Sequence, residues 1–124
     1  DKFESAFKEA AKARSSALAV AQDSLAQSNL KLIADLAIKN RLPAIYPRGD
    51  FVTSGGLMSY GADPAETYRR AALMVDKILK GAKPADLPVE QPTKFEFVIN
   101  LRTAKQIGQN IPPNVLARAD RIIR

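Results

Sequence analysis

The chain contains no cysteine, no histidine and no tryptophan among its 124 residues. Without cysteine there is no disulfide and no thiol nucleophile, and this absence leaves the compartment open, because a periplasmic protein can fold without a disulfide. Without histidine the chain lacks the usual general base and the commonest metal ligand. The two absences exclude a typical zinc site and catalysis by a Ser–His or Cys–His pair.

Long apolar runs and nucleotide-binding motifs are also missing. No stretch approaches the roughly 18 consecutive apolar residues of a membrane-spanning helix. The first residues, Asp1-Lys2-Phe3-Glu4, lack the pattern of a secretory signal, and the chain lacks an initiator methionine, so we expect an excised piece of a longer protein. No glycine-rich phosphate-binding motif and no nucleophile elbow occurs. We therefore expect no cofactor, no metal centre and no enzymatic activity.

The charge is basic but scattered. The 19 lysines and arginines exceed the 13 acidic residues, which gives a net charge of +6. No segment interleaves basic and aromatic residues as a binder of single-stranded nucleic acid does. The pattern favours a solvated basic surface over a nucleic-acid partner. The hydrophobic content of 46% is enough for the core of one domain.

Hydrophobic patterning predicts helices that alternate with short buried strands. We expect helices over 2–14, 29–39, 64–80 and 101–107 and from Pro112 through Asp120, and strands over 17–21, 42–46, 57–60 and 95–100. Residues 22–27 and 47–56 are predicted as loops, and 83–93 as an extended connector. This order predicts an α/β fold with a mostly parallel sheet flanked by helices. The helix predicted over 64–80 has the clearest N-terminal signal. Asp63 is its N-cap, Pro64 lies in its first turn, and Glu66 completes a capping-box-like pattern.

Open parallel sheets bind ligands beyond the carboxyl ends of their strands, and polar residues follow three of the predicted strands. Among them, Arg48 suits a charge-assisted bond to a carboxylate and Tyr60 suits cover for apolar surface. Glycines at both ends of the run Gly55–Gly61 would let a ligand or another backbone come close. The candidate ligand-binding residues are Asp23, Ser24, Tyr46, Arg48, Ser59, Tyr60 and Gly61.

Most of these residues also have a plain structural explanation. Asp23 and Ser24 suit a cap of the following segment, and Arg48 suits a solvated loop cation. Tyr60 suits a core or cleft-wall aromatic, and the hydroxyl of Ser59 suits a bond to its own backbone. The glycines suit turn geometry alone. The residues by themselves leave both interpretations open.

Several segments together resemble one family. The chain is similar, in the order and spacing of these segments, to the substrate-binding proteins of ABC transporters that include the tryptophan-binding type. The resemblance covers nearly the whole chain and corresponds to roughly the C-terminal half of a typical member. It rests on Leu42–Tyr46, Gly55–Gly61, Ile78–Pro92, Lys94–Lys105 and Ile111-Pro112-Pro113.

The resemblance implies a type I periplasmic-binding-protein fold, in which two lobes close on a ligand. Residues 2–57 and 93–124 would form the second lobe, and 58–92 would cross the hinge and place a helix on the first lobe. It also implies that Asp23 and Ser24 lie against the ligand and that Ser59, Tyr60 and Gly61 face the cleft. The segment Leu25-Ala26-Gln27 departs from the aromatic-rich loop of close relatives.

The function that the resemblance implies is capture of a small solute, an amino acid or another small carboxylate, for an ABC importer. Hinge closure would bury the ligand, and the closed form would dock on the membrane permease, in the periplasm or on an extracytoplasmic lipid anchor. The alternative is an effector-binding domain of a transcription regulator with the same fold. For the chain alone we expect self-association, by exchange of helix 64–80, through an apolar stripe of Tyr68, Ala72, Val75 and Leu79.

Overall fold

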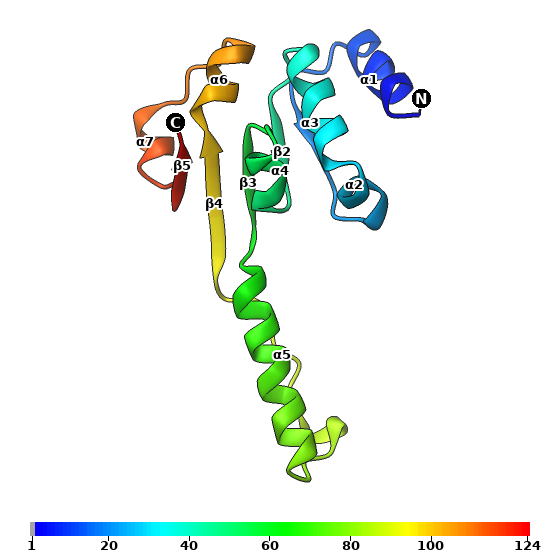
Figure 1. Cartoon of the computed structure of the whole chain (residues 1–124), viewed down its shortest axis with the longest axis vertical. Helices are drawn as coiled ribbons and strands as arrows, with labels where there is room; N and C mark the ends of the chain where they lie inside the picture. The colour runs from blue at the N-terminus through cyan, green and yellow to red at the C-terminus, as the bar shows by residue number, and fades with distance from the viewer. Residues whose placement is uncertain (1) are drawn as a thin grey trace. The chain divides into compact units, whose positions relative to one another are not determined.

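A computed structural model describes residues 2–124, which divide into two compact units (Figure 1). The first unit contains the residues up to Gly61 together with Glu96–Arg124, and the second contains Ala62–Phe95. The elements are α1 (Lys2–Lys12), β1 (Leu18–Ala19), α2 (Ser24–Ser28), α3 (Leu30–Lys39), β2 (Ala44–Tyr46), α4 (Gly49–Thr53), β3 (Met58–Ala62), α5 (Pro64–Leu79), the 3-10 turn η1 (Pro84–Asp86), β4 (Phe95–Asn100), α6 (Leu101–Ile107), α7 (Pro113–Leu116) and β5 (Arg121–Ile123).

The strands form one five-stranded sheet in the order β1-β2-β3-β4-β5. β1, β2 and β3 run parallel to one another, and β5 runs parallel to β4. β4 runs antiparallel to β3. Asn100 N donates to Leu57 O and Asp63 N donates to Lys94 O, so residues later in β3 pair with residues earlier in β4. The α/β fold with a mostly parallel sheet is confirmed.

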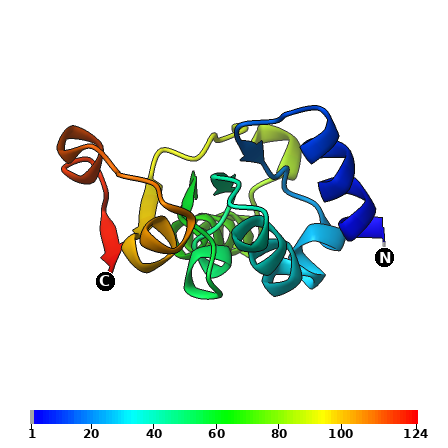
Figure 2. The ribbon, with the colours of Figure 1, turned by 90° about the horizontal axis from the view of Figure 1, so that it is seen from above.

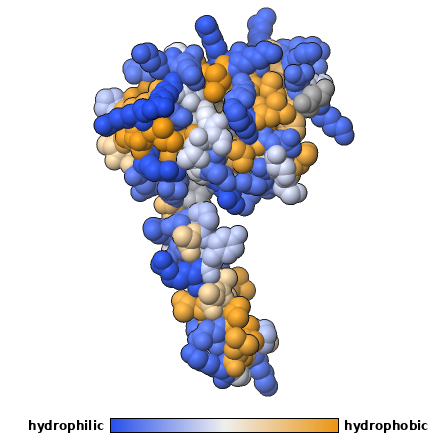
Figure 3. Space-filling view, in the orientation of Figure 1, coloured by the Kyte–Doolittle hydropathy of each residue, from blue (hydrophilic) through white to orange (hydrophobic). Residues whose placement is uncertain are grey.

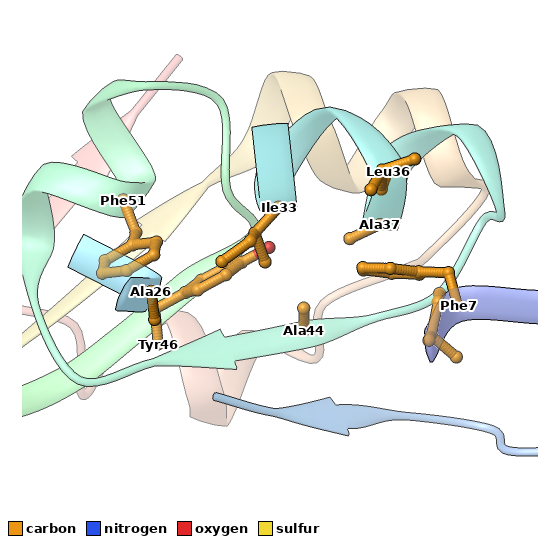
Figure 4. Close-up of a cluster of buried hydrophobic side chains, with 9 residues drawn as sticks. Phe7, Ala26, Ile33, Leu36, Ala37, Ala44, Tyr46 and Phe51 are labelled. Carbon is orange, nitrogen blue, oxygen red and sulfur yellow. The ribbon is translucent and has the colours of Figure 1, made fainter. Parts of the chain in front are cut away.

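In the first unit, α3, α4 and α6 cover one side of the sheet (Figure 2). Apolar side chains of α3 and α4 meet those of α1, α2 and β2 in one buried cluster, part of which Figure 4 shows, and α6 packs in a second cluster with Leu57. Burial of each large aliphatic or aromatic side chain here contributes about 1.5–3 kcal/mol. The buried members of this cluster are Phe7, Ala26, Ile33, Leu36, Ala37, Leu42, Ala44, Tyr46 and Phe51.

Four elements, α2, α4, α7 and β5, differ from the sequence prediction. The predicted loops 22–27 and 47–56 contain the short helices α2 and α4. α2 begins because Asp23 Oδ1 accepts a hydrogen bond from Ala26 N at 2.8 Å. α4 forms because it buries Phe51 and Val52. The predicted last helix is too long, since α7 ends at Leu116 and the following chain pairs with β4 as β5.

In the second unit, α5 begins where the sequence predicts. Asp63 Oδ1 accepts from Ala65 N at 2.9 Å, and Pro64 occupies the first turn. The capping-box role predicted for Glu66 is wrong, because its carboxylate pairs with Arg69 and Arg70. The cap's own N–H donates instead to Lys94 O at 3.0 Å.

Charged side chains tie α5 to the returning segment of the same unit. Arg70 Nη1 lies 3.0 Å from Glu90 Oε2, and Arg70 Nη2 donates to Thr93 Oγ1 at 2.9 Å. Asp63 Oδ2 lies 2.9 Å from Lys94 Nζ. The hydrogen bond from Lys94 is the main reason why the pKa of Asp63 lies below its ordinary value. The segment that leads to β4 is therefore fixed along one side of the helix.

The other side of α5 is uncovered, and no residue from Ala62 to Phe95 is buried. Tyr68 is 74% exposed and Leu79 is 82% exposed, and Val75 and Ala72 are exposed as well. Apolar side chains gather on the C-terminal part of α5 and the turn after it (Figure 3). The predicted apolar stripe is thus present and open.

Candidate functional site

Polar side chains meet where β1 and β2 end, at the edge of the sheet that carries α2 and α4 (Figure 1). Gln27 Nε2, from α2, donates to Asp50 Oδ2 at 2.8 Å. Arg48 Nη2, from the loop after β2, lies 2.9 Å from the same oxygen. A single carboxylate oxygen therefore joins the segments that follow two neighbouring parallel strands, which is where ligands bind in such sheets.

Arg48 is fixed in place but incompletely paired. Its side chain is 36% exposed, and that of Asp50 is 34% exposed. Arg48 Nε is nevertheless buried and has no hydrogen-bond partner among the described residues. A buried donor without a partner costs about 1–3 kcal/mol. The exposed part of the guanidinium, and not the buried Nε, therefore has N–H groups to offer an incoming anion.

A second ion pair lies beside Gly49, the first residue of α4. Glu96 Oε1 of β4 and Arg121 Nε of β5 are 3.6 Å apart. A Cβ at Gly49 would lie 3.2 Å from Arg121 Nη2 and 3.3 Å from Glu96 Oε2. This pair therefore borders the segment that holds Arg48 and Asp50.

Tyr60 is the exposed aromatic of the candidate set. Its ring is 56% exposed and meets Phe97 of β4 edge to face, with ring centroids 6.3 Å apart. The two rings stand opposite each other on neighbouring antiparallel strands, a position in which aromatic pairs stabilise a sheet. They provide an apolar surface on the first unit.

Tyr46 and Ser59 lie below the surface. They are register partners on β2 and β3, and each is 1% exposed. The Tyr46 ring stacks on Phe51 at 4.9 Å, and burial raises the pKa of its hydroxyl to about 12. Neither hydroxyl has a hydrogen-bond partner within the part of the chain that the structure describes. Both side chains belong to the core beneath the edge.

The glycines of the run Gly55–Gly61 permit close packing of backbone and ring. A Cβ at Gly61 would overlap the carbonyl oxygen of Pro47. A Cβ at Gly56 would lie 2.6 Å from Tyr46 Cε2 and 2.8 Å from Phe51 O. Gly55 has φ +114°, which L side chains rarely adopt. Packing within the chain thus accounts for these glycines.

The structure brings only some of the predicted residues together. Arg48 joins Asp50 and Gln27, and Gly61 lies against the segment that leads to Arg48. Asp23 caps α2 and Ser24 begins it, and both are exposed. Sequence reasoning missed Gln27, Glu96, Phe97 and Arg121 as members of this edge, because each reaches it through folding of separate strands or helices.

Residues 2–124 hold neither a metal centre nor a membrane span. No group of three or more acidic, histidine or cysteine side chains in this range is arranged to hold a metal ion. No helix in the same range is long and apolar enough to cross a membrane.

Comparison with known proteins gives consistent matches. The family model described as ABC transporter substrate binding protein matches residues 2–123. The tyrosine-binding protein of Clostridioides difficile strain R20291 is 29% identical over 90 residues, which are 73% of this chain and 26% of that protein.

Two solved structures share the fold. A conserved domain protein of Vibrio cholerae is 28% identical with a TM-score of 0.88, over 97% of this chain and 40% of that one. An ABC domain of Streptococcus pneumoniae in complex with L-Trp is 30% identical with a TM-score of 0.80, over 87% of this chain and 37% of that one.

The chain spans about a quarter to two fifths of the length of the proteins it matches. The family model covers nearly all of the chain and describes substrate-binding proteins of transporters, which are not enzymes. Arg48 and Asp50 follow the carboxyl end of a parallel strand, as a ligand site in such a sheet requires. With this match, we conclude that the chain belongs to the ABC transporter substrate-binding protein family.

Proposed function

We propose that the protein captures an amino acid or another small carboxylate at the edge where β1, β2 and β3 end, for uptake by an ABC importer. The observation that carries the proposal is Arg48, which Asp50 holds at 2.9 Å and whose side chain stays 36% exposed at this edge. The tyrosine-binding relative and the L-Trp complex support an amino acid as the ligand.

Each candidate residue has a role in this proposal. Arg48 binds the ligand carboxylate through charge-assisted hydrogen bonds. Tyr60, backed by Phe97, covers the apolar part of the ligand, and Gly61 keeps the strand close to Pro47. Asp23 and Ser24 line the same edge from the start of α2. Tyr46 and Ser59 support this wall from the core.

The opposite wall belongs to a first lobe supplied by the rest of the protein. In this proposal residues 2–57 and 93–124 are the second lobe, and 58–92 cross the hinge and place α5 on the first lobe. The open apolar side of α5 supports this, because a segment with no buried residue does not bury enough apolar surface to offset its loss of conformational entropy. Without the first lobe, the stripe on α5 pairs copies of the chain instead.

The mechanism is capture by closure. Ligand binds between open lobes, closure buries it, and the closed form docks on the permease subunits of the importer. The family match supports a location outside the cytoplasm, either free in the periplasm or held by a lipid anchor.

A calorimetric screen of the intact protein against the amino acids and a set of aromatic acids tests the proposal. The expected result is saturable binding of one small solute per molecule. Absence of binding by every compound in the screen would overturn it.

A further inference from the structure

The charged cluster at the start of α4 contains one cation and one anion in contact. Arg48 Nη2 and Asp50 Oδ2 are 2.9 Å apart, and both side chains are about one-third exposed, at 36% and 34%. An α-amino acid likewise has one anionic and one cationic group, separated by a single carbon. Two such groups on one ligand can therefore reach two side chains that touch each other.

We propose that Asp50 binds the ammonium group of the ligand while Arg48 binds its carboxylate, so that the site selects zwitterionic amino acids over carboxylic acids that lack the amino group. This inference rests on the proposed function. It adds Asp50 as a second ligand-contacting residue and defines the substrate class by its two charges.

The hydrogen bonds of Asp50 leave room for this contact. An ionised carboxylate has about four acceptor sites. Asp50 Oδ2 faces Gln27 Nε2 and Arg48 Nη2, and Oδ1 accepts from Phe51 N at 3.1 Å. One site on Oδ1 is left for an ammonium group.

The donors of Arg48 leave room as well. A guanidinium has five N–H groups in a planar fork. The contact with Asp50 engages Nη2 and Nε is buried, but the side chain is 36% exposed, so its remaining Nη–H groups are open to a ligand. A carboxylate that reaches the fork receives hydrogen bonds from groups whose orientation Asp50 already fixes.

The charge balance of the cluster favours a neutral, zwitterionic ligand. A lone arginine attracts any anion, whereas an arginine beside an aspartate has no net charge. The neighbouring pair, Glu96 and Arg121, is balanced too. A carboxylic acid without an amino group would place its negative charge near that of Asp50. It would also displace water from the Asp50 carboxylate without giving that carboxylate a new hydrogen-bond donor.

Gln27 is a positioning residue in this arrangement. It lies on α2, contacts Asp50 and hydrogen-bonds to no other charged group among the described residues. Its amide holds Asp50 Oδ2, the oxygen that Arg48 also contacts. Loss of the amide should therefore make the positions of both Arg48 and Asp50 less fixed. Substitution of Gln27 should therefore weaken an amino acid and the matched acid to a similar extent.

The test is calorimetric titration of the intact protein with L-tyrosine and L-tryptophan, and with the same two molecules lacking the amino group, 3-(4-hydroxyphenyl)propionate and 3-indolepropionate. The variants are Asp50→Asn and, as a matched control, Asp35→Asn, which removes an exposed carboxylate paired with Lys31 on α3. The asparagine side chain of Asp50→Asn keeps one oxygen that can accept from Gln27 and Arg48, and it loses the charge and the 3.1 Å contact with Phe51 N.

We expect the unmodified protein to prefer the amino acid by about tenfold or more, since its ammonium group adds a charge-assisted hydrogen bond to Asp50. Asp50→Asn should remove that preference by weakening the amino acid alone, and Asp35→Asn should change nothing. Equal weakening of both ligand types by Asp50→Asn would overturn the inference, because Asp50 would then only position Arg48. Binding of both ligand types with equal affinity by the unmodified protein would also overturn it. No binding of these four compounds or of any compound in the wider screen would overturn the proposed function itself.

Discussion

Arg48 and Asp50 lie in contact at the start of α4, with Nη2 2.9 Å from Oδ2. The contact joins the loop after β2 to α2, because Gln27 donates to the same oxygen. It therefore fixes a guanidinium at the edge of the sheet without filling all its donors. This relationship is the basis of the proposed ligand site.

Replacement of Arg48 by lysine should weaken ligand binding. Lysine keeps the charge but loses the planar fork that binds a carboxylate with two parallel hydrogen bonds. We expect the dissociation constant to rise about tenfold to a hundredfold, which corresponds to loss of about 1.4–2.8 kcal/mol. Titration calorimetry measures it, with Arg118→Lys, at an exposed position after α7, as the control. Unchanged affinity in Arg48→Lys would remove Arg48 from the site.

Replacement of Gly61 by alanine should destabilise the first unit. The new Cβ would overlap Pro47 O, which belongs to backbone and cannot rotate away. We expect a loss of about 3 kcal/mol in the free energy of unfolding, at the upper end for overpacking. Gly108→Ala is the comparison, since it has φ +75° but no atom within 4 Å, and it should cost about 1 kcal/mol. Urea unfolding measures the free energy of unfolding of both variants. Equal losses of stability would contradict the close approach of Gly61 to Pro47 O.

Removal of the Tyr46 hydroxyl should not destabilise the protein at neutral pH. The hydroxyl is buried without a partner among the described residues, so Tyr46→Phe should be neutral or stabilising by up to about 1 kcal/mol. Because the ring lies in the core, ligand affinity should stay the same. A loss of stability above about 1 kcal/mol at pH 7 would indicate a hydrogen bond of the hydroxyl.

The same hydroxyl makes stability depend on alkaline pH. Its folded pKa is about 12, raised by burial from 10.0, so the unfolded chain loses this proton first as pH rises. Stability should therefore fall between about pH 10 and pH 12, by roughly 3 kcal/mol in all, at about 1.4 kcal/mol per pH unit. Urea unfolding across this range should show a shallower fall in Tyr46→Phe. Tyr68→Phe, at a position that is 74% exposed, should behave like the unmodified protein.

The open side of α5 should govern self-association of the 124-residue chain. Val75 belongs to the apolar stripe and is 54% exposed, so Val75→Asp should shift the chain toward monomer by placing a charge in the contact. Leu73 is 57% exposed but lies on the opposite side by helical spacing, so Leu73→Asp should have little effect. Sedimentation at several concentrations measures both. Equal effects of the two variants would show that association does not use this stripe.

The sequence predicted those parts of the fold that depend on interactions between residues close together in the chain. α5 begins at Asp63-Pro64 as predicted, because an aspartate cap and a proline in the first turn act within a few residues. β5 was missed because three residues are too few for a periodic pattern, and the strand exists through its pairing with β4. α4 was missed because Gly49 and Asp50 are typical of turns, and burial of Phe51 and Val52 overrides that preference.

The candidate site was predictable only in outline. The rule that ligands lie beyond the carboxyl ends of parallel strands located Arg48. The sequence could not tell which side of the sheet Tyr46 faces, and the structure buries it against Phe51. Phe97 and Arg121 stand far from Arg48 along the chain, and only the pairing of β3 with β4 and of β4 with β5 brings them to this edge.

The most direct test of the central claim is a calorimetric titration of the intact protein with L-tyrosine and L-tryptophan. The account predicts saturable binding of one amino acid per molecule, with affinity that falls about tenfold or more in Arg48→Lys because the bidentate contact is lost. No saturable heat with these or with any other compound of the screen, or full affinity in the Arg48 variant, would contradict it.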